Sequence, residues 1–283
     1  MWFILGHVWI LSSVATDFDI PVVITSHGPD ITGVCESNKF HKQANKAAKE
    51  CQKIIAISNN NKERLNKIYD QYKDKIIFIP NGYNPDVFYR ENVKKEEVLN
   101  AFKIPNQYDK IVCFAGRLNK NKGIDILLKS AKIYEKDNVL TLIAGFGGEY
   151  EALNQLKQEL GLQNVIFVGD QSHANLRKIY SISDVCVVPS RQEAFGLVAL
   201  EAIACGTPVI ATKQGGMVDF ITNEVGRLVE RENVDQLAKA IYQVLNGEIT
   251  FDKEYLQNYA KENYSQEILM DQLLDLYEEV RRK

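Results

Sequence analysis

Short runs of β-branched and apolar residues alternate with amphipathic stretches along nearly the whole chain. The runs that predict strands lie at 1–5, 21–25, 53–57, 75–79, 110–115, 138–144, 164–168, 184–188, 208–212 and 226–229. Between most of them, apolar residues recur at helical spacing, as in 124–134 and 233–246. Because parallel strands must be joined through crossover connections, this alternation predicts an α/β fold with parallel sheets covered by helices on both faces.

A turn-rich segment, PNGYNPDVFYREN at 80–92, divides this pattern into two parts. Six predicted strands follow it, enough for one complete doubly wound sheet, whereas four precede it. We therefore expect a complete domain over 89–265 and a partial N-terminal domain over 1–88. The last stretch, 266–283, predicts an amphipathic helix.

Composition excludes several classes of protein. The net charge of −3 makes the chain a poor candidate for a general nucleic-acid binder. The apolar runs stop short of the roughly 18–20 residues that a membrane helix needs. The apolar start, MWFILGHVWILSSVA, is compatible with a signal peptide or with a strand and a helix, and the absence of any Lys or Arg before Lys39 favours the second.

The cysteines indicate the redox compartment. They are odd in number and none of them forms a CxxC pair: Cys35, Cys51, Cys113, Cys186 and Cys205. This usage predicts core thiols in a reducing compartment, hence a cytoplasmic protein, rather than a disulfide framework or a zinc site.

The loops that follow predicted strands are where an open α/β sheet binds ligands. In FAGRLNKNKG (114–123), Gly116 allows a tight turn, and Arg117 and Lys122 bracket a polar loop that leads into a helix. Two cations beside a helix N-terminus suit a diphosphate, although they could equally be solvated surface charges. In IAGFGGEYEAL (143–153), Gly145 and its neighbouring glycines would let backbone approach a ligand, a signal that is weak by itself.

The segment VVPSRQEAFGLVALEAIACGTPVIA (187–211) carries the strongest signal. A strand ends at Pro189, a loop carries Glu193, and a helix begins near Leu197 and holds Glu201. We expect both carboxylates to face one cleft, with helix amides between them. Carboxylates accept hydrogen bonds from sugar hydroxyls and helix amides suit phosphate, whereas the alternative is one helix-dipole glutamate and one surface glutamate.

Together these segments resemble the retaining glycosyltransferases of family 4, which have the GT-B fold of two facing Rossmann-like domains. The resemblance covers nearly the whole chain and rests on several ordered motifs: IPNGYNPDVF (79–88), AGRLNKNKG (115–123), IAGFGGE (143–149), EAFGLVALEA (193–202), GTPVIAT (206–212) and GGMVDFI (215–221). Two positions depart from the family pattern. Asn84 stands where Asp is usual, and nothing matches the family's first strand and Gly-rich loop, so the first domain is expected to lack its N-terminal part. The resemblance also implies that the predicted helix 266–283 packs back on the first domain.

The resemblance implies a role for each site residue. Arg117 and Lys122 would hold the donor diphosphate, and Glu193 would bind hydroxyls of the donor sugar. Glu201 would bind the nucleotide ribose, and His27, in TSHGPD after the strand 21–25, would face the reacting sugar. The remaining donor-binding positions would be Gly116, Gly145, Phe195, Gly196 and Leu197.

The resemblance also implies an activity and its partners. The chain would transfer a sugar from a nucleotide-diphosphate-sugar to a hydroxyl acceptor that is a glycan, a lipid-linked molecule or a small molecule. No cofactor and no metal ion are expected, since Arg117 and Lys122 could replace a metal. The alternatives are a truncated, non-catalytic nucleotide-sugar-binding fragment, one chain of a split glycosyltransferase, or a nucleotide-sugar epimerase of related fold.

A row of lysines forms a separate feature. Spaced by three and four residues, they share one face of a predicted helix: Lys39, Lys42, Lys46, Lys49 and Lys53. This face predicts either a solvated helix surface or weak docking to an anionic membrane surface, which would place the protein at the inner membrane face.

Overall fold

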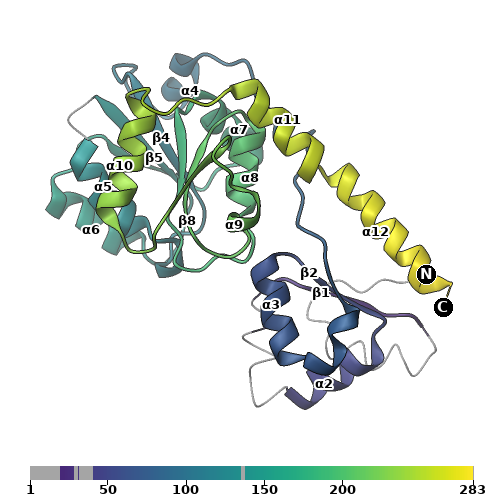
Figure 1. Ribbon diagram of the computed structural model, residues 1–283. Coiled ribbons are helices and arrows are strands. Elements are labelled where there is room, and N and C mark those ends of the chain that lie inside the picture. The colour runs from purple at the N-terminus through teal and green to yellow at the C-terminus, as the bar shows by residue number, and fades with distance from the viewer. Residues whose placement is uncertain (1–19, 29–30, 32–40, 135–137, 283) are drawn as a thin grey trace. The chain divides into compact units, whose positions relative to one another are not determined.

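The computed structural model describes residues 20–28, 31, 41–134 and 138–282, which divide into two compact units (Figure 1). The first unit contains the described residues up to Gly82 together with those from Gln266 onward, and the second spans Tyr83–Ser265. The predicted strand 1–5, Cys35 and Lys39 lie outside the described residues.

Three parallel strands form the sheet in the described part of the first unit, in the order β1-β2-β3. Their bounds are Val23–Ser26, Lys53–Ala56 and Ile76–Phe78, and the helices of this unit are α2 (His41–Glu50), α3 (Asn59–Ile68), the 3-10 helix η2 (Asp70–Lys75) and α12 (Gln266–Arg281).

Helices pack on both faces of this small sheet because successive strand residues point to opposite sides. On one face, Ile54 packs in a core with the alanines of α2 and with Leu65 of α3. On the other face, its neighbour Ile55 packs against Leu276 and Val280 of α12.

The second unit contains a parallel sheet with the order β6-β5-β4-β7-β8-β9. The strands are β4 (Lys110–Ala115), β5 (Val139–Ala144), β6 (Val165–Gly169), β7 (Val185–Val188), β8 (Val209–Thr212) and β9 (Gly226–Val229). The helices are α4 (Lys95–Ala101), η3 (Lys120–Lys122), α5 (Ile124–Tyr134), α6 (Tyr150–Leu160), α7 (His173–Ile182), α8 (Leu197–Ala204), α9 (Met217–Phe220), α10 (Val234–Leu245) and α11 (Lys253–Tyr264). This strand order is that of a doubly wound, Rossmann-like sheet, in which the direction of winding reverses between β4 and β7.

Helices cover both faces of the larger sheet. Figure 1 shows α5, α6 and α10 on one side of it and α7 and α8 on the other. Val112 and Phe114 of β4 share a core with the apolar faces of α5 and α10. Every residue from Ile111 to Ala115 is buried, which explains why this strand reads as a continuous apolar run.

The structure confirms the predicted α/β class with parallel sheets. The strands described agree with the predicted ones to within two residues at each end, and 124–134 forms α5 over the same residues. Cys51, Cys113, Cys186 and Cys205 are buried free thiols, as expected. No helix in the described part of the chain combines the length and the apolar composition that a membrane span requires.

Candidate functional site

A hollow of about 450 Å³ opens at the carboxyl edge of the larger sheet. Its walls come from the loops after β4, β5 and β6 and from the first turns of α7 and α8. The lining residues are Ala115, Gly116, Arg117, Ala144, Gly145, Phe146, Asp170, Gln171, His173, Leu176, Val198 and Glu201. Since β4 is the strand at which the winding reverses, the hollow occupies the position where doubly wound sheets bind ligands.

Bare main chain forms the wall between β4 and β5. The amide of Gly116 donates to the carbonyl oxygen of Ala144 at 3.0 Å, and the amide of Gly145 donates to that of Gly169 at 2.7 Å. A Cβ atom on Gly145 would lie 1.9 Å from the carbonyl oxygen of Gly116, so only glycine fits between these two loops. Phe146 follows with 71% of its surface exposed, although it is a large apolar residue.

Positive charge and free amides converge on this hollow. Arg117 is exposed and lies in the wall. The N-cap of α8 is Gly196, which has φ +105° and no side chain to cap the helix. No described residue accepts a hydrogen bond from the first amides of α8, at Leu197 and Val198, and a helix N-terminus of this kind attracts anions.

Glu201 brings a carboxyl group into the same wall from α8. Burial raises the pKa of Glu201 to about 7, and the nearby Tyr180 hydroxyl offsets part of that rise. The Tyr180 hydroxyl is fully buried and makes no hydrogen bond of ordinary geometry with any described residue. A largely buried carboxyl group with unused acceptor capacity suits a ligand that brings hydroxyl donors.

Glu193 and Lys122 form a second polar group. The Lys122 ammonium donates to Oε2 of Glu193 at 2.6 Å, with 24% and 15% of the two side chains exposed. The Ser190 hydroxyl lies 3.4 Å from the same oxygen. Neither Lys122 nor Glu193 is among the residues that line the hollow, so the structure does not place Glu193 and Glu201 in its wall together.

Phe195 has a structural position in the loop that carries Glu193. Its ring is buried and lies 5.2 Å from that of Phe220 and 6.5 Å from that of Tyr264, measured between centroids. The carbonyl oxygen of Ala194 accepts from the amide of Gly216 at 3.1 Å. Phe195 thus fixes the loop from inside, while Leu197 is exposed at the start of α8.

His27 lies in the first unit, directly after β1, and is exposed. Its neighbour Ser26 is fixed by the buried Asn61, whose side-chain amide donates to the Ser26 carbonyl oxygen at 2.9 Å. The Ser58 hydroxyl in turn caps α3 by accepting from the backbone amide of Asn61 at 3.1 Å. These hydrogen bonds fix the backbone at the carboxyl end of β1, from which His27 follows.

Eight of the twelve wall residues were not predicted as site residues, among them Phe146, Asp170, Gln171 and His173. The rule that ligands bind after strands would have included the first three, because they follow β5 and β6 directly. His173 begins α7, and its ring lies 5.4 Å from that of Phe88.

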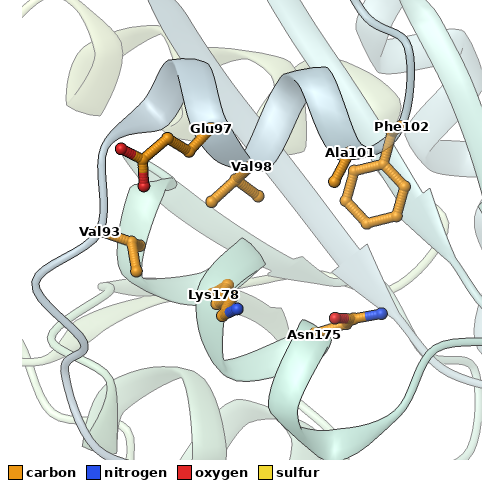
Figure 2. Close-up of a pocket in the computed structure, with 7 residues that line it drawn as sticks. All are labelled: Val93, Glu97, Val98, Ala101, Phe102, Asn175 and Lys178. Atoms are coloured by element: carbon orange, nitrogen blue, oxygen red, sulfur yellow. The ribbon is translucent and has the colours of Figure 1, made fainter.

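A second hollow, of about 160 Å³, lies between α4 and α7. Figure 2 shows Glu97, Val98 and Ala101 of α4 on one side and Asn175 and Lys178 of α7 on the other. Its other lining residues are Val93 and Phe102. No strand end and no glycine turn reaches it, so it lacks the features that make the larger hollow a candidate site.

The lysine row can be followed in part. Lys42, Lys46 and Lys49 are exposed on α2, whose buried face consists of alanines. The prediction was wrong for Lys53, because α2 ends at Glu50 and Lys53 begins the strand β2. Nζ of Lys46 lies 3.8 Å from Oε1 of Glu50, one helical turn away.

Across the described residues, no group of three or more His, Cys, Asp and Glu side chains is arranged to hold a metal ion.

Comparisons with known families match both parts of the chain. The model "Glycosyl transferases group 1" matches residues 96–265, and the model "Glycosyltransferase Family 4" matches residues 2–87. The motifs that define the loops after β4, β5 and β7 lie within the first of these matches.

Among curated proteins, the chain is 34% identical over 273 residues to an uncharacterised glycosyltransferase of Methanocaldococcus jannaschii, covering 91% of this chain and 69% of that protein. It is 33% identical over 206 residues to the D-inositol 3-phosphate glycosyltransferase of Mycolicibacterium smegmatis, covering 70% of this chain and 46% of that protein. The chain thus spans only part of the length of these relatives.

Among solved structures, sucrose-phosphate synthase from Thermosynechococcus elongatus superimposes with a TM-score of 0.79 and 26% identity, covering 97% of this chain and 72% of that one. Anabaena HepE, solved in complex with UDP, has a TM-score of 0.84 and 21% identity over 96% of this chain and 76% of that one. The second similarity supports the fold alone.

Proposed function

Because the chain belongs to the group 1 glycosyl transferases, we propose that it transfers a sugar from a nucleotide-diphosphate-sugar to a hydroxyl acceptor, with retention of the anomeric configuration. The observation that carries this proposal is the wall of the larger hollow. There an exposed arginine, an uncapped helix N-terminus and a buried carboxyl group converge on one space.

Each part of that wall suits one part of the donor. The carboxylate of Glu201 would accept hydrogen bonds from the ribose hydroxyls. Arg117 and the first amides of α8 would bind the diphosphate, since both present donors to an anion. UDP is the first nucleotide to test, because it is the nucleotide solved with HepE.

The second polar group suits the sugar and the departing phosphate. Glu193 has one carboxylate oxygen bonded to Lys122; its other oxygen has no partner in the described part of the chain and would accept from a sugar hydroxyl. The Lys122 ammonium has three donors, so it can keep Glu193 and also bind a phosphate oxygen.

In the reaction, the bond between the anomeric carbon and the diphosphate oxygen breaks, and the acceptor oxygen forms the new bond on the same face. The acceptor hydroxyl gives its proton to an oxygen of the departing diphosphate, so the nucleoside diphosphate leaves as the new bond forms. Arg117 and Lys122 would stabilise the charge that develops on the leaving group, which is an electrostatic contribution to catalysis. His27 would contact the reacting sugar from the first unit.

The relatives give little information about the chemical class of the acceptor. The relatives include D-inositol 3-phosphate glycosyltransferases, so a small polyol is one acceptor class to test beside glycans and lipid-linked molecules.

Because Arg117 and Lys122 supply positive charge beside the diphosphate, we expect turnover to continue in the presence of a chelator. Complete loss of turnover on chelation would contradict that expectation.

The test is calorimetric titration of the full chain with UDP and other nucleoside diphosphates, followed by hydrolysis of the matching nucleotide sugars. Binding with slow hydrolysis supports a transferase. Binding without hydrolysis or transfer favours the alternative, a chain that binds nucleotide sugars without transferring them. No binding to any nucleotide would overturn the proposal.

A substitution of Glu193 separates sugar binding from nucleotide binding. We expect Glu193→Ala to abolish hydrolysis and transfer while nucleoside diphosphate affinity and folding stay unchanged, because a loop carboxylate has little core role. Glu248→Ala, an exposed glutamate after α10, is the matched control and should retain full activity. Unchanged transfer in Glu193→Ala would remove Glu193 from the mechanism.

A further inference from the structure

Arg191 stands two residues before Glu193, and its guanidinium is occupied by two carboxylates. Its Nη1 and Nη2 donate to the two oxygens of Asp125 at 2.7 and 2.8 Å. Its Nε and Nη2 donate to the two oxygens of Glu232 at 2.5 and 3.0 Å. Both contacts have the bidentate geometry in which arginine binds carboxylates most strongly.

Arg191 also binds the turn that carries Lys122. Its backbone amide donates to the carbonyl oxygen of Asn121 at 2.7 Å, and its Nη1 donates to that of Lys120 at 2.7 Å. These two carbonyls, of Lys120 and Asn121, belong to η3 and immediately precede Lys122 in the chain. One residue therefore joins the loop after β4 to the loop after β7.

These contacts differ from those of an ordinary surface ion pair, which contributes little. About a quarter of the Arg191 side chain is exposed, and Arg191 binds each of its two carboxylate partners through two hydrogen bonds. Burial alone would raise the pKa of Asp125, yet the hydrogen bonds and charge of Arg191, with help from Lys129, outweigh burial and hold that pKa below its usual value. Two carboxylates neutralise the guanidinium, so Arg191 is unsuited to bind a donor phosphate itself.

We propose that Arg191 is a positioning residue, which fixes η3 and the Glu193 loop so that the Lys122 ammonium and the Glu193 carboxylate meet. This inference rests on the proposed function of that pair. The larger hollow is lined by neither Arg191 nor its partners, so the contacts that Arg117 and the α8 amides would make with the nucleotide do not depend on Arg191. Substitution of Arg191 should thus affect the chemical step more than nucleoside diphosphate affinity, to which Lys122 would contribute one phosphate contact.

The experiment compares Arg191→Ala and Arg191→Lys with the control Arg227→Ala. Arg227 is matched because its Nη1 also donates to two backbone carbonyls, those of Asn223 and Gly226, at the opposite end of the sheet. For Arg191→Ala we expect hydrolysis of the nucleotide sugar to fall by about 10- to 100-fold, the loss typical of a displaced catalytic group. UDP affinity should fall by no more than about fivefold, a difference of roughly 1 kcal/mol, because Arg117 and the α8 amides would still bind the diphosphate.

Lysine should restore only part of the rate, because an ammonium cannot bind two carboxylates bidentately. In a Glu193→Gln background, Arg191→Ala should cause a smaller loss than in the parent chain, because only the position of Lys122 is then left to disturb and residues that act through one another are not additive. A loss of UDP affinity as large as the loss of rate, an additive double variant or an unchanged rate would each overturn the proposal.

Hydrogen exchange keeps the proposal testable if the chain turns over no nucleotide sugar. In unliganded Arg191→Ala, peptides covering 118–123 and 190–196 should exchange faster than in the parent chain, while a peptide covering 139–144 should not change. Equal exchange in all three segments would overturn the positioning role. A lack of turnover in the parent chain would instead count against the proposed function.

Discussion

At the scale of single residues, the carboxyl group of Glu201 lies in surroundings that oppose its own charge. Its pKa is raised from 4.5 to about 7 by burial. Ribose hydroxyls would supply donors to the ionised form, so donor binding should lower this pKa. Affinity should then rise with pH up to about 7, by at most about tenfold per pH unit, and level off above.

This dependence is best measured by titrating a nucleotide sugar between pH 5.5 and 8.5. A nucleotide sugar is preferable to UDP because it has no terminal phosphate, a group whose second pKa of about 6 would overlap. Glu201→Gln should bind more weakly at high pH and show no pH step. An affinity that falls with rising pH would mean that the protonated acid, not the carboxylate, binds the ribose.

The same residue predicts a stability effect in the unliganded chain. Between pH 4.5 and about 7 the folded chain holds a proton on Glu201 that the unfolded chain has lost. The free energy of unfolding therefore falls as pH rises through this window, by about 1.4 kcal/mol per unit for this group. Relative to the parent chain, Glu201→Gln should thus gain stability from pH 5 to pH 8, on the order of 3 kcal/mol in all, which urea unfolding at both pH values would detect.

At the scale of elements, the turn between β8 and α9 supports the Glu193 loop. Gly215 in that turn has φ +53°, and a Cβ there would lie 1.7 Å from the carbonyl oxygen of Glu193. Gly215→Ala should therefore displace the Glu193 loop, lower hydrolysis by at least about tenfold and destabilise the chain by about 1–3 kcal/mol.

Gly247→Ala is the matched control for this turn. Gly247 also has a positive φ of +73°, but no atom lies within 4 Å of the position that a Cβ would take there. We expect the control to lose about 1 kcal/mol of stability from backbone strain and to keep its full rate. Equal rates in the two variants would show that the turn does not hold the loop.

At the scale of the whole molecule, the second unit has its own core, and its first residue is bonded to its last two. The amide of Tyr83 donates to the carbonyl oxygen of Tyr264 at 3.0 Å, and Tyr83 forms a parallel bridge with Ser265. Residues 83–265 expressed alone should fold cooperatively and bind UDP within about fivefold of the full chain, a difference of roughly 1 kcal/mol. They should not transfer sugar, because His27 is absent. An unfolded fragment by circular dichroism, or a loss of UDP binding, would contradict this prediction.

Much of the fold follows from local sequence. Val139–Ala144 was predictable as a strand because it is a short, continuous apolar run, and Ile124–Tyr134 as a helix because its apolar residues recur at helical spacing. Arg117, Gly145 and Glu201 were predictable as site residues, because the ligand edge of a parallel sheet lies after its strands and because the motifs resemble a known family.

Tertiary structure decided what those residues contact. Arg191 is 66 residues from Asp125 and 41 from Glu232, and nothing in the local sequence links them. Likewise, the elevated pKa of Glu201 arises from the elements that bury it, and the separation of the Glu193–Lys122 pair from the walls of the hollow depends on how two loops fold. Periodicity reports which face of an element is buried. Only packing between distant segments determines which charges meet, because hydrogen bonds and desolvation act over a few ångströms in space and not along the chain.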